Sequence, residues 1–184
     1  MRTLGISIVL AMVAAVVVMA GRPAASPATQ PAGATALPQA PTDVALLKTF
    51  GSAAEVQSLF AKAKGERKEG QVMVAERILS LAPYAVNLEY RPVEGAVAVH
   101  EKEAELVYVI DGGGTLTTGG TVLGEKRTNA ANLSGTAIDG GTIQTLAKGD
   151  FAIIPEGTPH QFKPANGLLV LMTMHVPRPV GSAQ

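Results

Sequence analysis

The sequence has 184 residues with 15 basic and 15 acidic side chains, and only 16% of its residues are charged. This balance argues against nucleic-acid binding, which needs a clustered basic excess, so we expect no nucleic-acid partner. The absence of cysteine excludes disulfides, thiolate metal sites and cysteine nucleophiles. Tryptophan is absent and aromatic residues make up 4%, so the core must be built from Val, Leu, Ile and Ala.

The N-terminal segment predicts a location outside the cytoplasm. Arg2 precedes an apolar run over residues 4–20, in which Val18 and Ala20 are small residues at the spacing that a signal peptidase reads. We therefore predict a signal peptide at residues 1–20. The alternative is an uncleaved anchor, which would be the protein's only contact with a membrane. Both alternatives predict a periplasmic or secreted protein.

Two segments of different composition follow. Residues 21–42 are rich in Ala and Pro with almost no charge, which is typical of a disordered tether. Residues 43–70 are predicted to be a helical extension, with a helix from Ser52 to Lys64 that Ser52 and Glu55 open as a capping box. Four apolar residues then share one helical face, which we expect to pack on the domain: Val56, Leu59, Phe60 and Ala63.

Residues 71–180 have the pattern of a β domain. Short runs rich in Val, Ile, Thr and Tyr alternate with Gly, Pro, Asn and Asp. Many short strands at this spacing are typical of an antiparallel sandwich or barrel. Residues 124–141 are polar and rich in turn formers, and they predict a long loop, the kind of segment that often binds ligands.

A first candidate site lies around His100 and Glu105. His100 ends the run "AVAVHE" and Glu105 opens "ELVYVID". If the two runs form a hairpin, the imidazole and the carboxylate lie close together across its turn, as ligands for Zn, Mn, Fe, Ni or Cu would. The alternative from these residues alone is a solvated pair beside a turn.

A second candidate lies in "KGDFAIIPEGTPHQF", residues 148–162. Gly157 can supply the positive φ of a tight turn, and Pro159 fixes the backbone just before His160. A histidine held this rigidly is a good ligand candidate, because little entropy is lost when it binds. The alternative is a histidine that caps the end of a strand.

Together the two stretches resemble the motifs of the cupin superfamily over roughly residues 86–176. The second cupin motif is Gly, five residues, Pro-x-Gly, two residues and His, and this sequence matches it at Gly149, Pro155, Gly157 and His160. The first motif has two histidines one residue apart, then Glu and Gly, and here it is matched by His100, Glu105 and Gly112. The place of its first histidine is occupied by Ala98.

The resemblance implies an all-β fold, an antiparallel jelly-roll β-barrel with one short N-terminal α-helix packed on it. It also implies a divalent metal ion held inside the barrel by His100, Glu105 and His160. Two imidazoles and one carboxylate are a sufficient ligand set, although Ala98 removes the fourth ligand that the family usually has. The resemblance gives no role to His175, which we expect at the exterior or the rim.

Two functions fit these observations. The first is a metal-dependent enzyme acting on a small molecule, with oxygenase, isomerase or lyase chemistry undecided because the sequence indicates no separate general base. The second is a non-catalytic module that binds a small ligand without a metal, which the space left at Ala98 would suit. The family resemblance also makes a homodimer one option.

Overall fold

The structure is a computed structural model that describes residues 47–178. The predicted signal peptide and tether lie outside these residues and stay predictions. The described elements are α1 (Ala53–Glu66), β1 (Val74–Leu81), β2 (Tyr84–Arg91), β3 (Val97–His100), β4 (Glu103–Thr118), β5 (Thr121–Leu123), β6 (Lys126–Arg127), β7 (Asn132–Gly135), β8 (Ala137–Asp139), β9 (Thr142–Ala147), β10 (Phe151–Ile154) and β11 (His160–Pro177). Within this part of the chain, no helix combines the length and the apolar character that a bilayer crossing requires.

The helix α1 begins and packs as the sequence predicts. The Ser52 hydroxyl accepts a hydrogen bond from the backbone N–H of Glu55 at 3.2 Å, and so satisfies one of the free amides of the first turn. The helix continues beyond Lys64 to Glu66, so the predicted end was two residues early. An ion pair of 3.3 Å between Lys62 and Glu66 spans this last turn.

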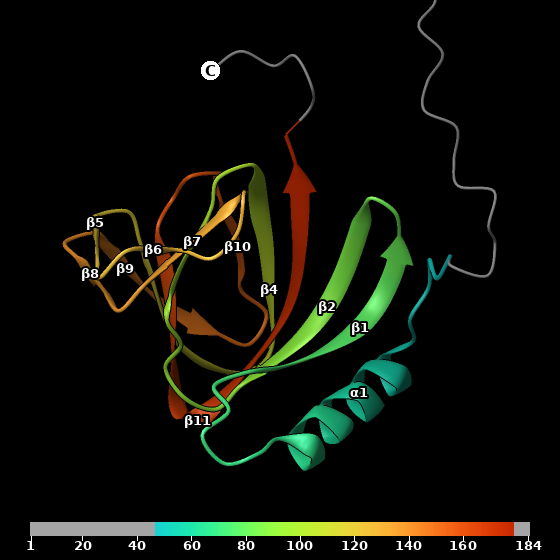
Figure 1. Ribbon diagram of the computed structural model, residues 1–184. Helices are drawn as coiled ribbons and strands as arrows, with labels where there is room; N and C mark the ends of the chain where they lie inside the picture. Colours follow the sequence, from blue (N-terminus) through green and yellow to red (C-terminus); the bar gives the residue numbers. More distant parts are fainter. Residues whose placement is uncertain (1–46, 179–184) are drawn as a thin grey trace, which may run out of the picture. The chain divides into compact units, whose positions relative to one another are not determined.

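The apolar face of α1 covers one face of the sheet (Figure 1). Its residues pack against apolar side chains of β1, β2 and β11 in a single cluster, whose buried members are Ala63, Val74, Ile78, Leu88, Tyr90 and Val170. The opposite face of the same strands therefore points away from the helix, because successive side chains of a strand alternate between its two faces.

The sheet is antiparallel but does not close into the expected barrel. Its hydrogen-bonded order is β1-β2-β11-β3-β7-β6, and β4 pairs with β9, β10 and β11. In the described residues β1 pairs with β2 on one side, and on the other it meets only an isolated bridge from Lys48 to Ser80. The segment before β1 forms a helix instead of a further strand, so this edge of the sheet stays open.

The triple glycine, Gly112, Gly113 and Gly114, lies within β4. A Cβ on Gly112 would lie 2.2 Å from the carbonyl oxygen of Leu168, and one on Gly114 would lie 2.2 Å from that of Lys163. Only residues without a side chain allow the backbones of β4 and β11 to approach this closely. The β4–β11 register also shifts here, between Pro164 and Leu169.

The two long strands, β4 and β11, curve at the triple glycine, so that the two ends of their ladder come close together. His160, at the start of β11, pairs with Thr118 at the end of β4, whereas His175 pairs with Glu105 near the start of β4. The side chains of His160 and Glu105 are nevertheless only 3.0 Å apart, so the two ends of the ladder face each other. Between them lies the second apolar cluster: Val107, Val109, Leu116, Leu146, Ile154, Phe162, Leu169 and Leu171.

Residues 124–141 are more regular than the predicted long loop. They contain β6, β7 and β8, and β7 pairs with β3 through Asn132 to Gly135. Exposure accounts for only part of the polar composition that suggested a loop, because both residues of β6 are exposed whereas β7 and β8 are mainly half-buried. The pairing with β3 matters for function because it brings Asn132 to His100.

Candidate metal centre

Glu105 is the centre of the site. It lies on β4 between Ile154 of β10 and His175 of β11, its cross-strand partners, and it is only 3% exposed. The alternation of β4 places Glu105 on the same face as the buried Val107 and Val109, inside the fold. A carboxylate buried this deeply needs compensation by a cation or by several hydrogen bonds.

Two of the predicted ligands contact this carboxylate. The Nε2 atom of His160 lies 3.0 Å from Oε2 of Glu105, and Nε2 of His100 lies 3.6 Å from the same oxygen. The hairpin considered for these two runs is not formed, because β3 pairs with β7 and β11 instead of β4. His100 and Glu105 still lie close together, because β3 and β4 both pair with β11.

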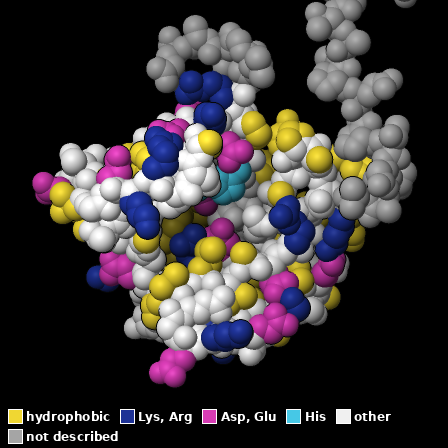
Figure 2. Space-filling view, in the orientation of Figure 1, with side chains coloured by type: hydrophobic (Ala, Val, Ile, Leu, Met, Phe, Trp, Pro, Cys, Tyr) yellow, Lys and Arg dark blue, Asp and Glu magenta, His cyan; other side chains and the backbone are white. Residues whose placement is uncertain are grey.

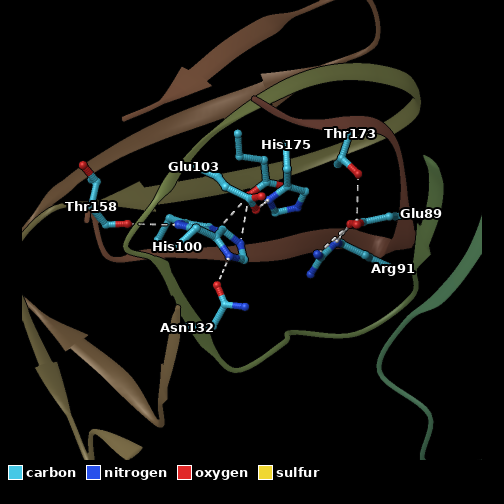
Figure 3. A network of polar contacts seen from close by, with 10 residues as sticks. Glu89, Arg91, His100, Glu103, Asn132, Thr158, Thr173 and His175 are labelled. Carbon is cyan, nitrogen blue, oxygen red and sulfur yellow. Dashed lines mark hydrogen bonds and ion pairs between the residues drawn. The ribbon is translucent and has the colours of Figure 1, made fainter. Parts of the chain in front are cut away.

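The other nitrogen of each imidazole is fixed by an acceptor. The Nδ1 atom of His160 donates to the backbone carbonyl of Thr158 at 3.1 Å. The Nδ1 atom of His100 is 2.8 Å from the side-chain oxygen Oδ1 of Asn132, which can only accept a hydrogen bond (Figure 3). In the neutral rings the proton is therefore on Nδ1, and the Nε2 lone pairs point toward Glu105, as in metal-binding histidines.

When the imidazoles are neutral and carry their proton on Nδ1, the arrangement brings acceptor atoms together with no donor between them. Oε2 of Glu105 is buried and has no hydrogen-bond partner in residues 47–178, and Nδ1 of His175 is the only other such side-chain atom described. Leaving a buried polar group unsatisfied costs about 1–3 kcal/mol. A divalent metal ion can accept several converging lone pairs at once, so this donor set fits such an ion.

The electrostatics of the site follow from burial and from the close imidazoles. Burial lowers the pKa of His100, an effect that the hydrogen bond to Asn132 opposes and the field of His175 reinforces. Burial would raise the pKa of Glu105, but the contact with His160 and the fields of the three imidazoles outweigh it, so this pKa lies below its usual range. Glu105 is therefore anionic at neutral pH, and His100 is neutral.

The structure adds His175, which lies outside both sequence motifs. One ligand atom each from His100, Glu105 and His175 lie within 4.8 Å of one another. The rings of His100 and His175 meet edge to face with their centroids 4.4 Å apart. Because "LLVLMTMHV" is apolar on both faces, its alternation does not indicate which way His175 points. The available signal was that the whole chain has only three histidines.

The turn of the second motif is joined directly to the first motif. Gly157 has a φ of 71°, as the predicted tight turn requires. Its backbone N–H donates to the carbonyl oxygen of His100 at 2.8 Å. The backbone N–H of Arg178 donates to the carbonyl oxygen of Lys102 at 3.1 Å. These bonds hold the ligand-bearing segments of β3, β10 and β11 together without using the imidazoles.

A hollow gives access to the centre. Figure 2 shows this hollow in the molecular surface, with histidine and acidic side chains along its wall. The side chains of His100 and His175 are 20% and 30% exposed, whereas those of Glu105 and His160 are 3% exposed. One side of the centre is therefore open to a small molecule. A separate apolar cavity between α1 and the sheet has neither a histidine nor a carboxylate in its lining.

A second polar network lies on the same face of the sheet (Figure 3). Glu89 is 7% exposed, and its Oε1 accepts a hydrogen bond from Oγ1 of Thr173 at 3.0 Å. Its Oε2 accepts one from Nε of Arg91 at 2.9 Å. The guanidinium of Arg91 lies over the ring of Phe162, 4.9 Å from its centroid. Every oxygen of this carboxylate is satisfied within the protein.

The fold is similar to solved cupin and double-stranded β-helix structures. The cupin domain of Cnp3 from Schizosaccharomyces pombe is 13% identical over 62% of this chain and 72% of that one, with a TM-score of 0.45. A double-stranded β-helix protein of Klebsiella pneumoniae is 19% identical over 62% and 85% of the two chains, with a TM-score of 0.45. A protein of Thermus thermophilus is 19% identical over 65% and 95%, with a TM-score of 0.46.

No family model matches the sequence, and no curated protein matches it. The identities are low and the superpositions partial, so the roles of individual residues rest on the geometry above. That geometry brings the predicted residues of both motifs to one carboxylate, and it adds a third imidazole.

Proposed function

We propose that this chain is a cupin-type domain that binds a divalent metal ion at Glu105, through His100, Glu105 and His160. We further propose that it acts on, or binds, a small molecule in the adjoining hollow. The observation that carries the proposal is the unpartnered oxygen of Glu105, faced by the Nε2 atoms of two histidines whose Nδ1 protons are already engaged.

The bound ion would supply a Lewis acid or redox centre next to the hollow. The chain's own residues have simpler roles. Glu105 supplies the negative charge, while Thr158 and Asn132 hold the two imidazoles in the tautomer that leaves Nε2 free. The exposed sides of His100 and His175 leave room for a ligand, while the apolar cluster behind Glu105 excludes water from the other side.

The alternative function is a binding module that holds a small ligand without a metal. Ala98 favours it, because the place of a fourth family ligand is filled by a methyl group. The two functions differ in what happens to Glu105. In the module its charge would be balanced by a protonated imidazole instead of an ion, so purified protein would contain no stoichiometric metal.

Metal content decides between these functions. The full chain, purified without a metal-chelating tag, is expected to contain close to one divalent ion per chain by mass spectrometry, or to take one up on reconstitution. His100→Ala and His160→Ala should each reduce the bound fraction by more than about tenfold, because each removes a ligand nitrogen. Glu125→Gln, an exposed carboxylate of the β5–β6 connection, is the control and should bind as wild type does.

Folding of each variant is checked by circular dichroism. If no divalent ion binds to the folded wild-type chain even after reconstitution with Zn²⁺, Mn²⁺, Fe²⁺, Ni²⁺ or Cu²⁺, the metal proposal is wrong and the binding module stands. The extracytoplasmic location and the homodimer stay predictions from the sequence.

A further inference from the structure

We infer that His175 is a fourth ligand of the proposed metal centre, and that it replaces the histidine missing at position 98. The inference rests on the proposed function and assigns a residue that neither sequence motif includes. It makes the ligand set three imidazole nitrogens and one carboxylate oxygen, supplied by His100, Glu105, His160 and His175.

The register of the sheet places His175 at the centre. His175 of β11 is the direct cross-strand partner of Glu105 of β4, and such partners have Cβ atoms about 4.5–5.5 Å apart on the same face. The ligand atoms of His175, Glu105 and His100 are within 4.8 Å of one another. His175 is therefore near enough to the carboxylate for one ion to bind both side chains.

The hydrogen bonding of His175 also indicates a missing partner. Its Nδ1 atom is buried and has no hydrogen-bond partner among the described residues. The nearest acidic group is Glu103, whose Oε2 lies 3.3 Å from this nitrogen but forms no hydrogen bond with it. The two unpartnered buried side-chain atoms described in residues 47–178 thus belong to directly paired residues, and one ion would satisfy both.

The composition of the chain supports the same conclusion. All three histidines of the 184-residue sequence surround Glu105, although they come from two strands and are up to 75 positions apart. Ala98 is the cross-strand partner of His160, so its methyl group faces the same side of the sheet as the ligands. A histidine at 98 would reach the centre beside His160, whereas His175 reaches it beside Glu105.

Nitrogen NMR of the histidines tests the inference without any activity assay. In the metal-free full chain labelled with ¹⁵N-histidine, the three imidazoles give three sets of long-range ¹H–¹⁵N correlations. One equivalent of Zn²⁺ should shift a ring nitrogen of all three. If His100 and His160 shift while the His175 nitrogens do not, His175 is not a ligand and the proposed function survives. If no imidazole shifts and no ion binds, the proposed function falls with it.

Two variants separate ligation from packing. His175→Phe keeps an aromatic ring against His100 but removes both nitrogens, and it should weaken Zn²⁺ binding by at least about tenfold, as loss of a metal-site partner commonly does. Adding Ala98→His to this variant should restore at least tenfold of the affinity, whereas Glu103→Gln in the wild-type chain should change it by less than tenfold. An affinity of His175→Phe within twofold of wild type, or no recovery in a folded double variant, would overturn the inference.

Discussion

Two glutamates are buried on the same face of this sheet, and their surroundings are opposite. Glu89 is 7% exposed and every oxygen has a protein donor, from Thr173 and Arg91. Glu105 is 3% exposed and has an unpartnered oxygen facing imidazole nitrogens. Burial alone therefore does not distinguish a structural carboxylate from a ligand. The distinction lies in whether the protein itself completes the hydrogen bonding.

The neighbours explain why the two carboxylates differ. Arg91 carries a permanent charge and lies two residues from Glu89 on β2, so the ion pair forms within one strand. The neighbours of Glu105 are imidazoles, which are charged only when protonated, and the pKa of His100 is lowered by burial. A buried carboxylate whose neighbours are neutral imidazoles can bind a metal ion from solution. A buried carboxylate already paired with a guanidinium cannot.

The largest effect is expected when Arg91 is removed. Arg91→Ala leaves Glu89 buried and unpaired, and breaking a buried pair in this way typically costs about 3–5 kcal/mol of the free energy of unfolding. Urea denaturation of the metal-free chain measures it. The control is Lys163→Ala, which breaks the exposed pair with Glu94 and should cost less than about 1 kcal/mol. Equal costs for the two variants would contradict the structural role of the Glu89 pair.

The next effect tests which carboxylate holds the ion. Saturating divalent metal at about 100 times its Kd should stabilise the wild-type chain by about 2.7 kcal/mol, because the ion binds only the folded state. Glu89→Gln should keep this metal-induced increase in Tm, and Glu105→Gln should lose it, since only the latter removes the anionic ligand. The two variants are matched in burial and chemistry. If Glu89→Gln abolishes the increase and Glu105→Gln keeps it, the comparison between the two glutamates is reversed.

The sequence was sufficient to predict which motif residues lie together. The cupin resemblance implied His100, Glu105 and His160 as metal ligands, which stays a prediction, and the structure places both histidines within 3.6 Å of the carboxylate. Spacing succeeds here because the tight turn at Gly157 and the start of β11 are local structures, fixed by a few adjacent residues.

The sequence was not sufficient where strand pairing decides. His175 meets Glu105 because the pairing of β4 and β11 resumes after the irregularity at the triple glycine and continues to the start of β4. β3 pairs with β7, which lies in the residues predicted to be a loop. The hydrogen bond from His100 to Asn132 depends on that pairing. Whether the sheet closes into a barrel likewise depends on the pairing of its edge strands, and in the described residues β1 leaves one edge open. Pairing between distant strands is not encoded in any short run of residues.

The smallest effect is a change in stability with pH in the metal-free protein. The pKa of Glu105 lies below its usual range because of its imidazole neighbours, so its carboxylate stabilises the fold above its unfolded pKa of about 4.3, and this contribution is lost as pH falls through the lower folded value. The pKa of His100 is lowered by burial, so its contribution is lost as pH falls below its unfolded value of about 6.5.

These directions predict how the effect of Glu105→Gln depends on pH in the metal-free chain. At pH 7 the fold favours the ionised carboxylate, so the variant should be less stable than wild type by about 1 kcal/mol, the net contribution of a typical hydrogen bond. This difference should shrink as pH falls below about 4.3 and through the lower folded pKa of Glu105, because the wild-type side chain then becomes neutral like the amide. Urea denaturation in the presence of a chelator measures the difference at each pH. A destabilisation of equal size at pH 7 and in acid would mean that the charge of Glu105 contributes nothing to the stability of the metal-free fold.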